Sequence, residues 1–199
     1  MEAFRRYFAP GGPAWGYERQ ALVKLRAIAG DAPLGQIVEA MRDEYVYTDQ
    51  PFDVTAMRAM RERQVRHLVA PGTFNLKYSP GGLADVEYLV QGLQITHGAC
   101  FPNLRSTNTR EAMAALHQAG ILSEEAYMRL RKAHTFLRWA IDGLRVVRGN
   151  AKDITLPPAT SEEFAYLARR MPYDADPVRL SAALTQYTQD VIAVGAVLS

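Results

Sequence analysis

The stretch SEEAYMRLRKAHTFLRWAIDGLRVVR, residues 123–148, decides the fold class of this chain. Its apolar side chains recur at steps of three and four residues, which places them on one face of an α-helix. The positions are Leu130, His134, Leu137, Ile141 and Leu144. Ser123 is a favourable N-cap, and the two acids after it complement the positive end of the helix dipole. The pattern therefore predicts one long helix that ends at Arg148.

The C-terminal segment repeats this pattern. Asp176 followed by Pro177 is a typical helix start, because aspartate caps the first amides and proline fits the first helical position. The apolar positions that follow again share one face, and they are Leu180, Leu184, Tyr187, Val191, Val194 and Leu198. We therefore expect an amphipathic C-terminal helix.

Shorter helical patterns occupy most of the remaining chain. They cover residues 14–29, 34–46, 53–69, 82–97, 109–119 and 161–171. Capping boxes starting at Asn108 and Thr160 mark two of these helices, and Gly120 is suited to end the first. Residues 74–78 form the one candidate strand. The sequence thus predicts an all-α fold, a helical bundle of about seven or eight helices.

Composition and charge exclude several classes of protein. The chain has 199 residues, of which 48% are apolar and 22% charged, so it is not a disordered polypeptide. The net charge of +2 gives no basic footprint for nucleic acid. The single cysteine, Cys100, excludes an internal disulfide and a cysteine-based metal cluster. No apolar run approaches the roughly 18 residues of a membrane helix. We expect a cytoplasmic protein with no membrane or nucleic-acid partner.

The most unusual local sequence runs from Lys77 to Tyr88. A lysine precedes the pair Gly81 and Gly82, which opens a helix carrying Asp85 and Glu87. Glycines at a helix start can leave amide groups open to an anion, and a lysine can add a point charge for a phosphate. A simple turn with a favourably placed aspartate explains the same residues. The residues alone leave the two interpretations open.

Two further groups of basic residues are candidates for binding an anionic partner. Lys24 and Arg26 lie outside the apolar stripe of their helical segment, which is typical of a solvated face. Arg131, Arg138 and Arg145 are spaced seven apart and share one face of the long helix. This row could meet an anionic partner or remain in water.

No spacing of residues indicates a metal site or a catalytic nucleophile. Asp174 and Asp176 have the spacing of a two-carboxylate metal motif, but Asp176 is already explained as a helix cap. His134 lies on an apolar face, where a core histidine is expected more often than a ligand. We therefore predict no catalytic residue and no metal ligand in this chain.

Four blocks of sequence carry a resemblance to a known family. They are FNLKYSPGGLADVEY at 74–88, ERQALVKLR at 18–26, LRSTNT at 104–109 and AHTFLR at 133–138. In this order they resemble the helical region of the glutamine synthetase adenylyltransferases. The related uridylyltransferases of the PII signal protein share the lysine, double-glycine and aspartate core. The resemblance spans about residues 15–145.

The resemblance implies a domain division and a set of roles. Residues 1–50 would be the tail of a nucleotidyltransferase domain, and residues 51–199 a helical bundle domain of the adenylyltransferase type. Lys77, Gly81, Gly82 and Asp85 would border a nucleotide cleft. Glu87 would orient that loop or support a proton transfer. Lys24 and Arg26 would steady phosphates from the opposite wall.

One departure from the family pattern limits what this chain is expected to do. The family's catalytic core has Gly-Ser followed by an Asp-x-Asp pair that holds Mg²⁺, and this sequence contains no Gly-Ser dipeptide. The intact enzyme would transfer AMP from ATP to a tyrosine of glutamine synthetase, or remove it, with Mg²⁺. This chain alone would be inactive and would require no cofactor. Its expected partners are glutamine synthetase and the PII protein. The alternative is a non-catalytic interaction module that binds a protein through Arg131, Arg138 and Arg145.

Overall fold

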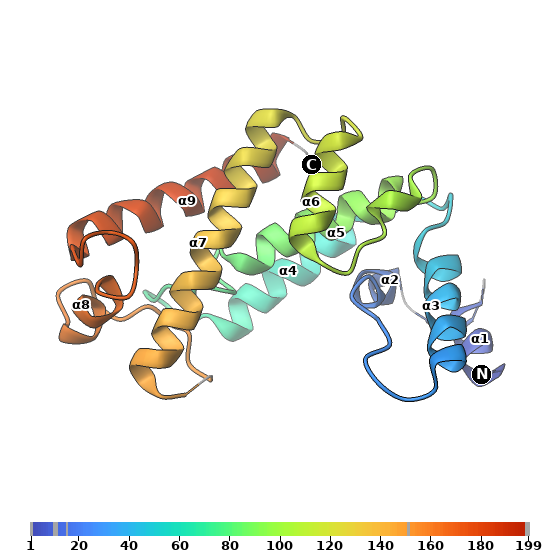
Figure 1. Ribbon diagram of the computed structural model, residues 1–199, viewed down its shortest axis with the longest axis horizontal. Coiled ribbons are helices and arrows are strands. Elements are labelled where there is room, and N and C mark those ends of the chain that lie inside the picture. Colours follow the sequence, from blue (N-terminus) through green and yellow to red (C-terminus); the bar gives the residue numbers. More distant parts are fainter. Residues whose placement is uncertain (1, 10–11, 15, 151, 198–199) are drawn as a thin grey trace. The chain divides into compact units, whose positions relative to one another are not determined.

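A computed structural model describes residues 2–9, 12–14, 16–150 and 152–197, and the predicted all-α fold is confirmed. These residues form nine α-helices and a short 3-10 helix, η1 (Pro102–Leu104) (Figure 1). The α-helices are α1 (Glu2–Phe8), α2 (Gly16–Leu22), α3 (Ala32–Val46), α4 (Val54–Leu68), α5 (Leu83–His97), α6 (Thr109–Gln118), α7 (Glu124–Arg148), α8 (Glu162–Ala168) and α9 (Pro177–Val197). No helix among the described residues is long and apolar enough to cross a membrane.

Three helices begin at, or one residue away from, the position that their capping residues predict. Asp176 Oδ1 accepts a hydrogen bond from the amide of Val178 at 2.8 Å, so α9 starts at Pro177. Asn108 Oδ1 accepts from Arg110 N at 3.0 Å and caps α6. The cap of α8 is Ser161 rather than the predicted Thr160, with its hydroxyl accepting from the amide of Phe164. The structure also contains α1 and η1, which the sequence pattern did not predict.

The helix predicted over residues 14–29 is shorter in the structure than its pattern of apolar residues indicates. It ends at Leu22, and the next residues turn with the amide of Leu25 donating to the carbonyl of Leu22 at 2.9 Å. Arg42 Nη1 donates to the carbonyl of Leu25 at 2.6 Å and fixes this exit. A contact from α3 therefore ends a helix that local spacing would have continued.

The candidate strand over 74–78 is reduced to one isolated bridge between Asn75 and Thr155. Leu76 N donates to Ile154 O at 3.1 Å, and Leu156 N donates to Phe74 O at 2.7 Å. The chain then bends into a turn, because the amide of Ser79 donates back to the carbonyl of Asn75. The short apolar run is therefore a loop pinned to the segment before α8.

The chain divides into two compact units. Unit 1 comprises residues 1–58 and 88–123, and unit 2 comprises residues 59–87 and 124–199. The core of unit 1 contains Val23, Val46, Tyr47 and Ile95. These two units are defined by their compactness alone. The domain boundary at residue 50, which the family resemblance implied, stays a prediction.

The core of unit 2 is built on the predicted face of α7, which packs against α8 and α9 (Figure 1). Leu130, Leu137 and Leu144 on that face are fully buried. Phe164 on α8 and Leu180 on α9 are also buried. Burying a large aliphatic side chain stabilises a fold by roughly 1.5–3 kcal/mol. The packing of these three helices therefore contributes to the stability of unit 2.

Candidate functional site

Residues 74–85, which we call the motif loop, form a tightly hydrogen-bonded turn that leads into α5. Asn75 Oδ1 accepts from the amides of Lys77 and Tyr78, both at 3.0 Å. The amide of Asn75 donates to Ser79 Oγ at 2.8 Å. Asn75 and Ser79 are both buried. The loop is therefore held by its own polar side chains, which fix where α5 begins.

Asp85 ties the motif loop to α4. Its Oδ2 accepts from the amide of Gly81 at 2.6 Å, and its Oδ1 accepts from Arg61 Nε at 2.6 Å. Arg61 also donates through Nη2 to the carbonyls of Tyr78 at 2.8 Å and Ser79 at 3.2 Å. One guanidinium thus neutralises the aspartate and holds two loop carbonyls.

Arg61 contacts the motif loop, and no sequence pattern predicted this role. It lies on α4, whose predicted helix carries the further arginines Arg58, Arg63 and Arg66. Nothing in the local spacing distinguishes Arg61 from them. Its role becomes visible only because the fold brings it to Asp85, 24 positions along the chain.

Both glycines of the motif have structural reasons to be glycine. Gly81 has φ of +76°, and a Cβ there would lie 2.5 Å from the carbonyl oxygen of Thr188 on α9. At Gly82 a Cβ would lie 2.8 Å from the carbonyl oxygens of Lys77 and Ser79. A side chain at either position would displace backbone, so the loop can approach α9 only with glycine.

The first amides of α5 are already bonded. Gly82 N donates to Ser79 O at 2.9 Å, Leu83 N to Leu76 O at 3.0 Å, and Ala84 N to Lys77 O at 2.9 Å. In this conformation the glycine amides therefore serve the turn. The side chains of Lys77 and Glu87 are both half-buried. Lys77 Nζ lies 5.2 Å from the ring centroid of Tyr78, a cation–π distance.

Lys24 and Arg26 belong to unit 1, whereas Lys77, Gly81, Gly82, Asp85 and Glu87 belong to unit 2. Lys24 Nζ donates to the carbonyl of Thr107 at 3.0 Å and to Thr109 Oγ1 at 2.6 Å. These bonds attach the turn after α2 to the start of α6. Arg26 is exposed. Lys24 thus has a structural role that its sequence pattern did not predict.

A second buried arginine organises unit 1. Arg19 donates to Val46 O through Nη2 at 2.9 Å, and to Gln50 O through Nη1 at 3.1 Å. Its Nη2 also donates to Thr48 Oγ1 at 3.1 Å. Burial lowers the pKa of Arg19 below its ordinary value, because removing water disfavours the charged form. Arg19 lies in the second resemblance block, but the sequence did not mark it as buried.

Arg19 also lines a cavity of about 820 Å³ in unit 1. Aromatic rings from three segments form much of its wall, namely Phe4, Phe8, Tyr45 and Phe52. Phe8 and Tyr45 contact each other with ring centroids 4.8 Å apart. Its volume and apolar lining are in the range of ligand pockets. Sequence spacing could not have revealed it, because the lining residues come from separate segments.

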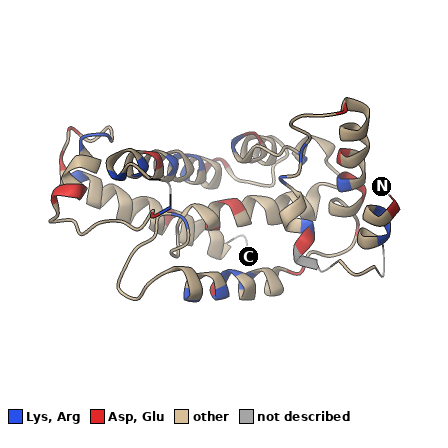
Figure 2. Cartoon of the chain, turned by 90° about the horizontal axis from the view of Figure 1, so that it is seen from below, with Lys and Arg blue, Asp and Glu red and all other residues tan. Residues whose placement is uncertain are grey.

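The predicted arginine row lies on the surface of α7. Arg131, Arg138 and Arg145 are all exposed. Arg145 forms an ion pair with Asp142 at 3.3 Å. Among the described residues no carboxylate forms an ion pair with Arg131 or Arg138. Charges of both signs are interspersed along the helices elsewhere (Figure 2).

The described residues contain no group of three histidine, cysteine or acidic side chains that could hold a metal ion. Asp174 and Asp176 pair with Arg179, with Arg179 Nη1 at 2.5 Å from Asp174 Oδ2. His134 is buried on the apolar face of α7, as its spacing predicted. These acids and this histidine are therefore accounted for by structural contacts.

Comparisons with known proteins agree with the resemblance. The profile of the GlnD PII-uridylyltransferase family matches residues 55–198. Three similar curated proteins are bifunctional glutamine synthetase adenylyltransferase/adenylyl-removing enzymes. That of Streptomyces avermitilis is 32% identical over 87% of this chain and 18% of its own length. That of Streptomyces coelicolor is 34% identical over 77% and 16%. That of Mycolicibacterium paratuberculosis is 35% identical over 85% and 17%. The chain thus spans less than a fifth of the length of these relatives.

Proposed function

This chain belongs to the GlnD PII-uridylyltransferase family, and from that premise we propose that it is a helical domain of a larger adenylyltransferase acting on glutamine synthetase. The observation that carries the proposal is the similarity of most of the chain to one stretch of several bifunctional adenylyltransferases. The intact enzyme would transfer AMP from ATP to a tyrosine of glutamine synthetase, or remove it. We also propose that the PII protein is a partner of the enzyme and that the enzyme is cytoplasmic.

The chain's own residues would position the substrate rather than perform the transfer. The described residues do not fit a Mg²⁺ site, because no three of their metal-binding side chains gather. We therefore assign Mg²⁺ no ligand in them. ATP and Mg²⁺ would be used by the intact enzyme, and the separate chain would not transfer a nucleotide.

Within unit 2 the proposal gives the motif loop two kinds of residue. Gly81, Gly82 and Asp85 would shape the turn, since each has a packing or hydrogen-bonding partner there. Lys77 would supply a positive charge for a phosphate, and Glu87 would orient the loop or support proton transfer. Lys77 suits this role because the residue is half-buried and its Nζ lies 5.2 Å from the ring centroid of Tyr78, and a charge near a protein surface is less screened than in bulk water.

For unit 1 the proposal is that Arg26 and Lys24 could steady phosphates by their positive charge. Arg26 is exposed, so its guanidinium is available to a ligand. Lys24 already donates to Thr107 and Thr109, so its contribution would be through the field of its charge.

Titration of the chain with Mg·ATP tests the nucleotide role. We expect measurable heat on binding, and a loss of affinity of about fivefold in Lys77→Ala, the effect of one partly screened charge. Lys152→Ala is the matched control, because Lys152 is an exposed lysine of the same unit outside the motif loop. Equal affinity of Lys77→Ala and the parent chain would refute the phosphate role.

Incubation with glutamine synthetase and labelled ATP tests the domain assignment. We expect the chain to bind glutamine synthetase without labelling it, because the transfer chemistry would reside elsewhere in the enzyme. Incorporation of label catalysed by this chain alone would contradict the proposal of an inactive domain.

The second candidate function is a non-catalytic interaction module using Arg131, Arg138 and Arg145. The observation that favours it is the exposure of Arg131 and Arg138 without an ion-pair partner among the described residues. Binding of glutamine synthetase together with no detectable nucleotide affinity would favour this module over the first candidate.

A further inference from the structure

A small groove on unit 2 lies between α7 and α9. It has a volume of about 320 Å³ and an aromatic floor. Phe136 is 3% exposed at its base, and its ring centroid lies 4.7 Å from that of Tyr187 and 5.8 Å from that of Tyr173. The hydroxyls of the two tyrosines are hydrogen-bonded to each other. The floor is therefore a rigid, packed surface.

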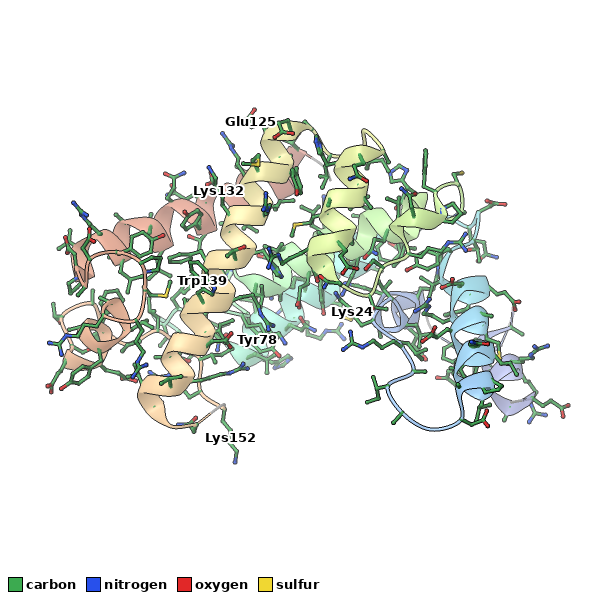
Figure 3. All side chains as sticks on the ribbon, viewed as in Figure 1. Lys24, Tyr78, Glu125, Lys132, Trp139 and Lys152 are labelled. Atoms are coloured by element: carbon green, nitrogen blue, oxygen red, sulfur yellow. The ribbon has the colours of Figure 1, made fainter. Side chains whose placement is uncertain are left out.

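The rim of the groove combines an exposed indole with two cations. Trp139 is 54% exposed, although a tryptophan gains more free energy from burial than almost any other side chain. Arg131 and Lys132 line the same groove and are exposed. Lys132 and Trp139 both extend from α7 (Figure 3). Tryptophan, tyrosine and arginine are the residues that dominate binding energy at protein interfaces.

The charges at this rim lack compensation, in contrast to their neighbours on the same helix. Arg129 pairs with Glu125 at 2.7 Å, Arg145 with Asp142, and Arg148 with Glu163. Among the described residues no carboxylate forms an ion pair with Arg131 or Lys132. A basic rim around an apolar floor is complementary to an acidic segment with an apolar side chain.

The groove's walls determine how recognition would occur. Apart from Tyr173 in the turn before α9, its lining comes from α7 and α9, whose interior amides are bonded within the helix and are not offered to a ligand. Its volume suits one or two apolar side chains rather than a whole nucleotide. Specificity would therefore come from the indole, the phenyl floor and the two cations.

We propose that this groove binds an acidic segment of a partner protein. An aliphatic or aromatic side chain of that segment lies between Trp139 and Phe136, and flanking carboxylates bind Arg131 and Lys132. The site goes beyond the nucleotide role, because it uses none of the motif-loop residues. Either proposal can fail while the other stands.

A random-peptide display library tests the proposal without assuming the partner's identity. The library is selected on the full chain and counter-selected on the double variant Arg131→Glu and Lys132→Glu. We expect an enriched consensus with at least two acids flanking a leucine, phenylalanine or tryptophan. An acid-free consensus, a purely acidic one, or no enrichment would overturn the proposal.

A titration of the enriched peptide then locates its binding site. The chain has two tryptophans, so Trp15→Phe makes the fluorescence report on Trp139 alone. Saturable change is expected, with a loss of affinity of about tenfold or more in the double variant. Lys152→Glu is the matched control, since Lys152 is an exposed cation of unit 2 outside the groove, and it should change affinity less than about twofold. Circular dichroism verifies that each variant is folded.

Two results would overturn the site even if a peptide binds. One is an equal loss of affinity in Lys152→Glu and in the double variant, which would indicate general attraction between opposite charges. The other is unchanged affinity by calorimetry in Trp139→Ala, which would mean that the indole is not the apolar contact.

Discussion

Arg61 in unit 2 and Arg19 in unit 1 are two buried arginines with the same task and different partners. Each holds the backbone carbonyls of a loop. Arg61 also contacts a carboxylate, because Asp85 Oδ1 lies 2.6 Å from its Nε. Arg19 contacts three carbonyls and a hydroxyl, all neutral. At the motif loop a carboxylate balances the positive charge of Arg61. In unit 1 only the dipoles of carbonyl and hydroxyl groups stabilise the positive charge of Arg19.

Buried polar atoms without a hydrogen bond occur in both units. In unit 1, three buried atoms have no hydrogen-bond partner among the described residues, namely Gln20 Oε1, Tyr47 Oη and Gln94 Oε1. In unit 2, Arg61 Nη1 on α4 is such an atom, so both units contain them. An unsatisfied buried polar atom costs about 1–3 kcal/mol. The comparison teaches that a carboxylate balances the buried charge of Arg61, whereas carbonyls and a hydroxyl alone stabilise that of Arg19.

The largest expected effect is from breaking the charge pair of the motif loop. Asp85→Ala leaves Arg61 buried without its counter-charge, and we expect a loss of about 3–5 kcal/mol in the free energy of unfolding. Urea denaturation measures it. The matched control is Asp142→Ala, which breaks an exposed pair with Arg145 and should cost less than about 1 kcal/mol. Equal costs for the two variants would show that Arg61 and Asp85 are effectively solvated.

Next in size is Gly81→Ala. The left-handed backbone and the overlap with Thr188 should together cost about 3 kcal/mol. Gly149→Ala separates the two causes, because Gly149 has φ of +65° with no atom near its Cβ position. This control should cost about 1 kcal/mol, the backbone contribution alone. If both glycines respond alike in thermal unfolding, close packing of the loop on α9 is not the reason for Gly81.

Arg19→Met should have a smaller effect than Asp85→Ala, which is the direct test of the comparison. The substitution removes the hydrogen bonds to Val46 and Gln50 but leaves no opposite charge unpaired. We expect a loss of about 2 kcal/mol, from carbonyls that lose their donor. Denaturation in urea at two salt concentrations checks it, because a neutral environment predicts little salt dependence. A loss larger than that of Asp85→Ala would reverse the comparison.

The smallest effect, with the opposite sign, is expected from Tyr47→Phe. The Tyr47 hydroxyl is buried without a hydrogen-bond partner among the described residues, so removing it should stabilise the protein by about 1 kcal/mol at pH 7. Burial raises the pKa of Tyr47 to about 12. A raised pKa gives stability that is complete below the ordinary value of 10 and is lost as the pH rises toward 12.

The unfolding free energy of the parent should therefore fall more steeply than that of Tyr47→Phe between pH 10 and 12. The difference should reach about 2–3 kcal/mol, because one pKa unit corresponds to 1.36 kcal/mol. Parallel pH profiles for the two proteins would mean that the hydroxyl ionises equally in the folded and unfolded states.

Much of the fold could be predicted because helices are specified by near neighbours. The predicted start of α7 after Ser123 and its end at Arg148 are confirmed, as is the start of α9 at Pro177. Errors occurred where a distant residue intervened. Arg42 holds the exit from α2, and Ile154 bonds the predicted strand at Leu76.

The sequence by itself determined the helices, their caps and the family motif, because these depend on spacing and on residue types a few positions apart. The tertiary structure alone decided which arginine pairs with Asp85 and why Gly81 must be glycine. It also brought Tyr173 and Tyr187 against Phe136. These contacts join residues far apart in the chain, and such distances are set by packing, which local sequence patterns do not encode.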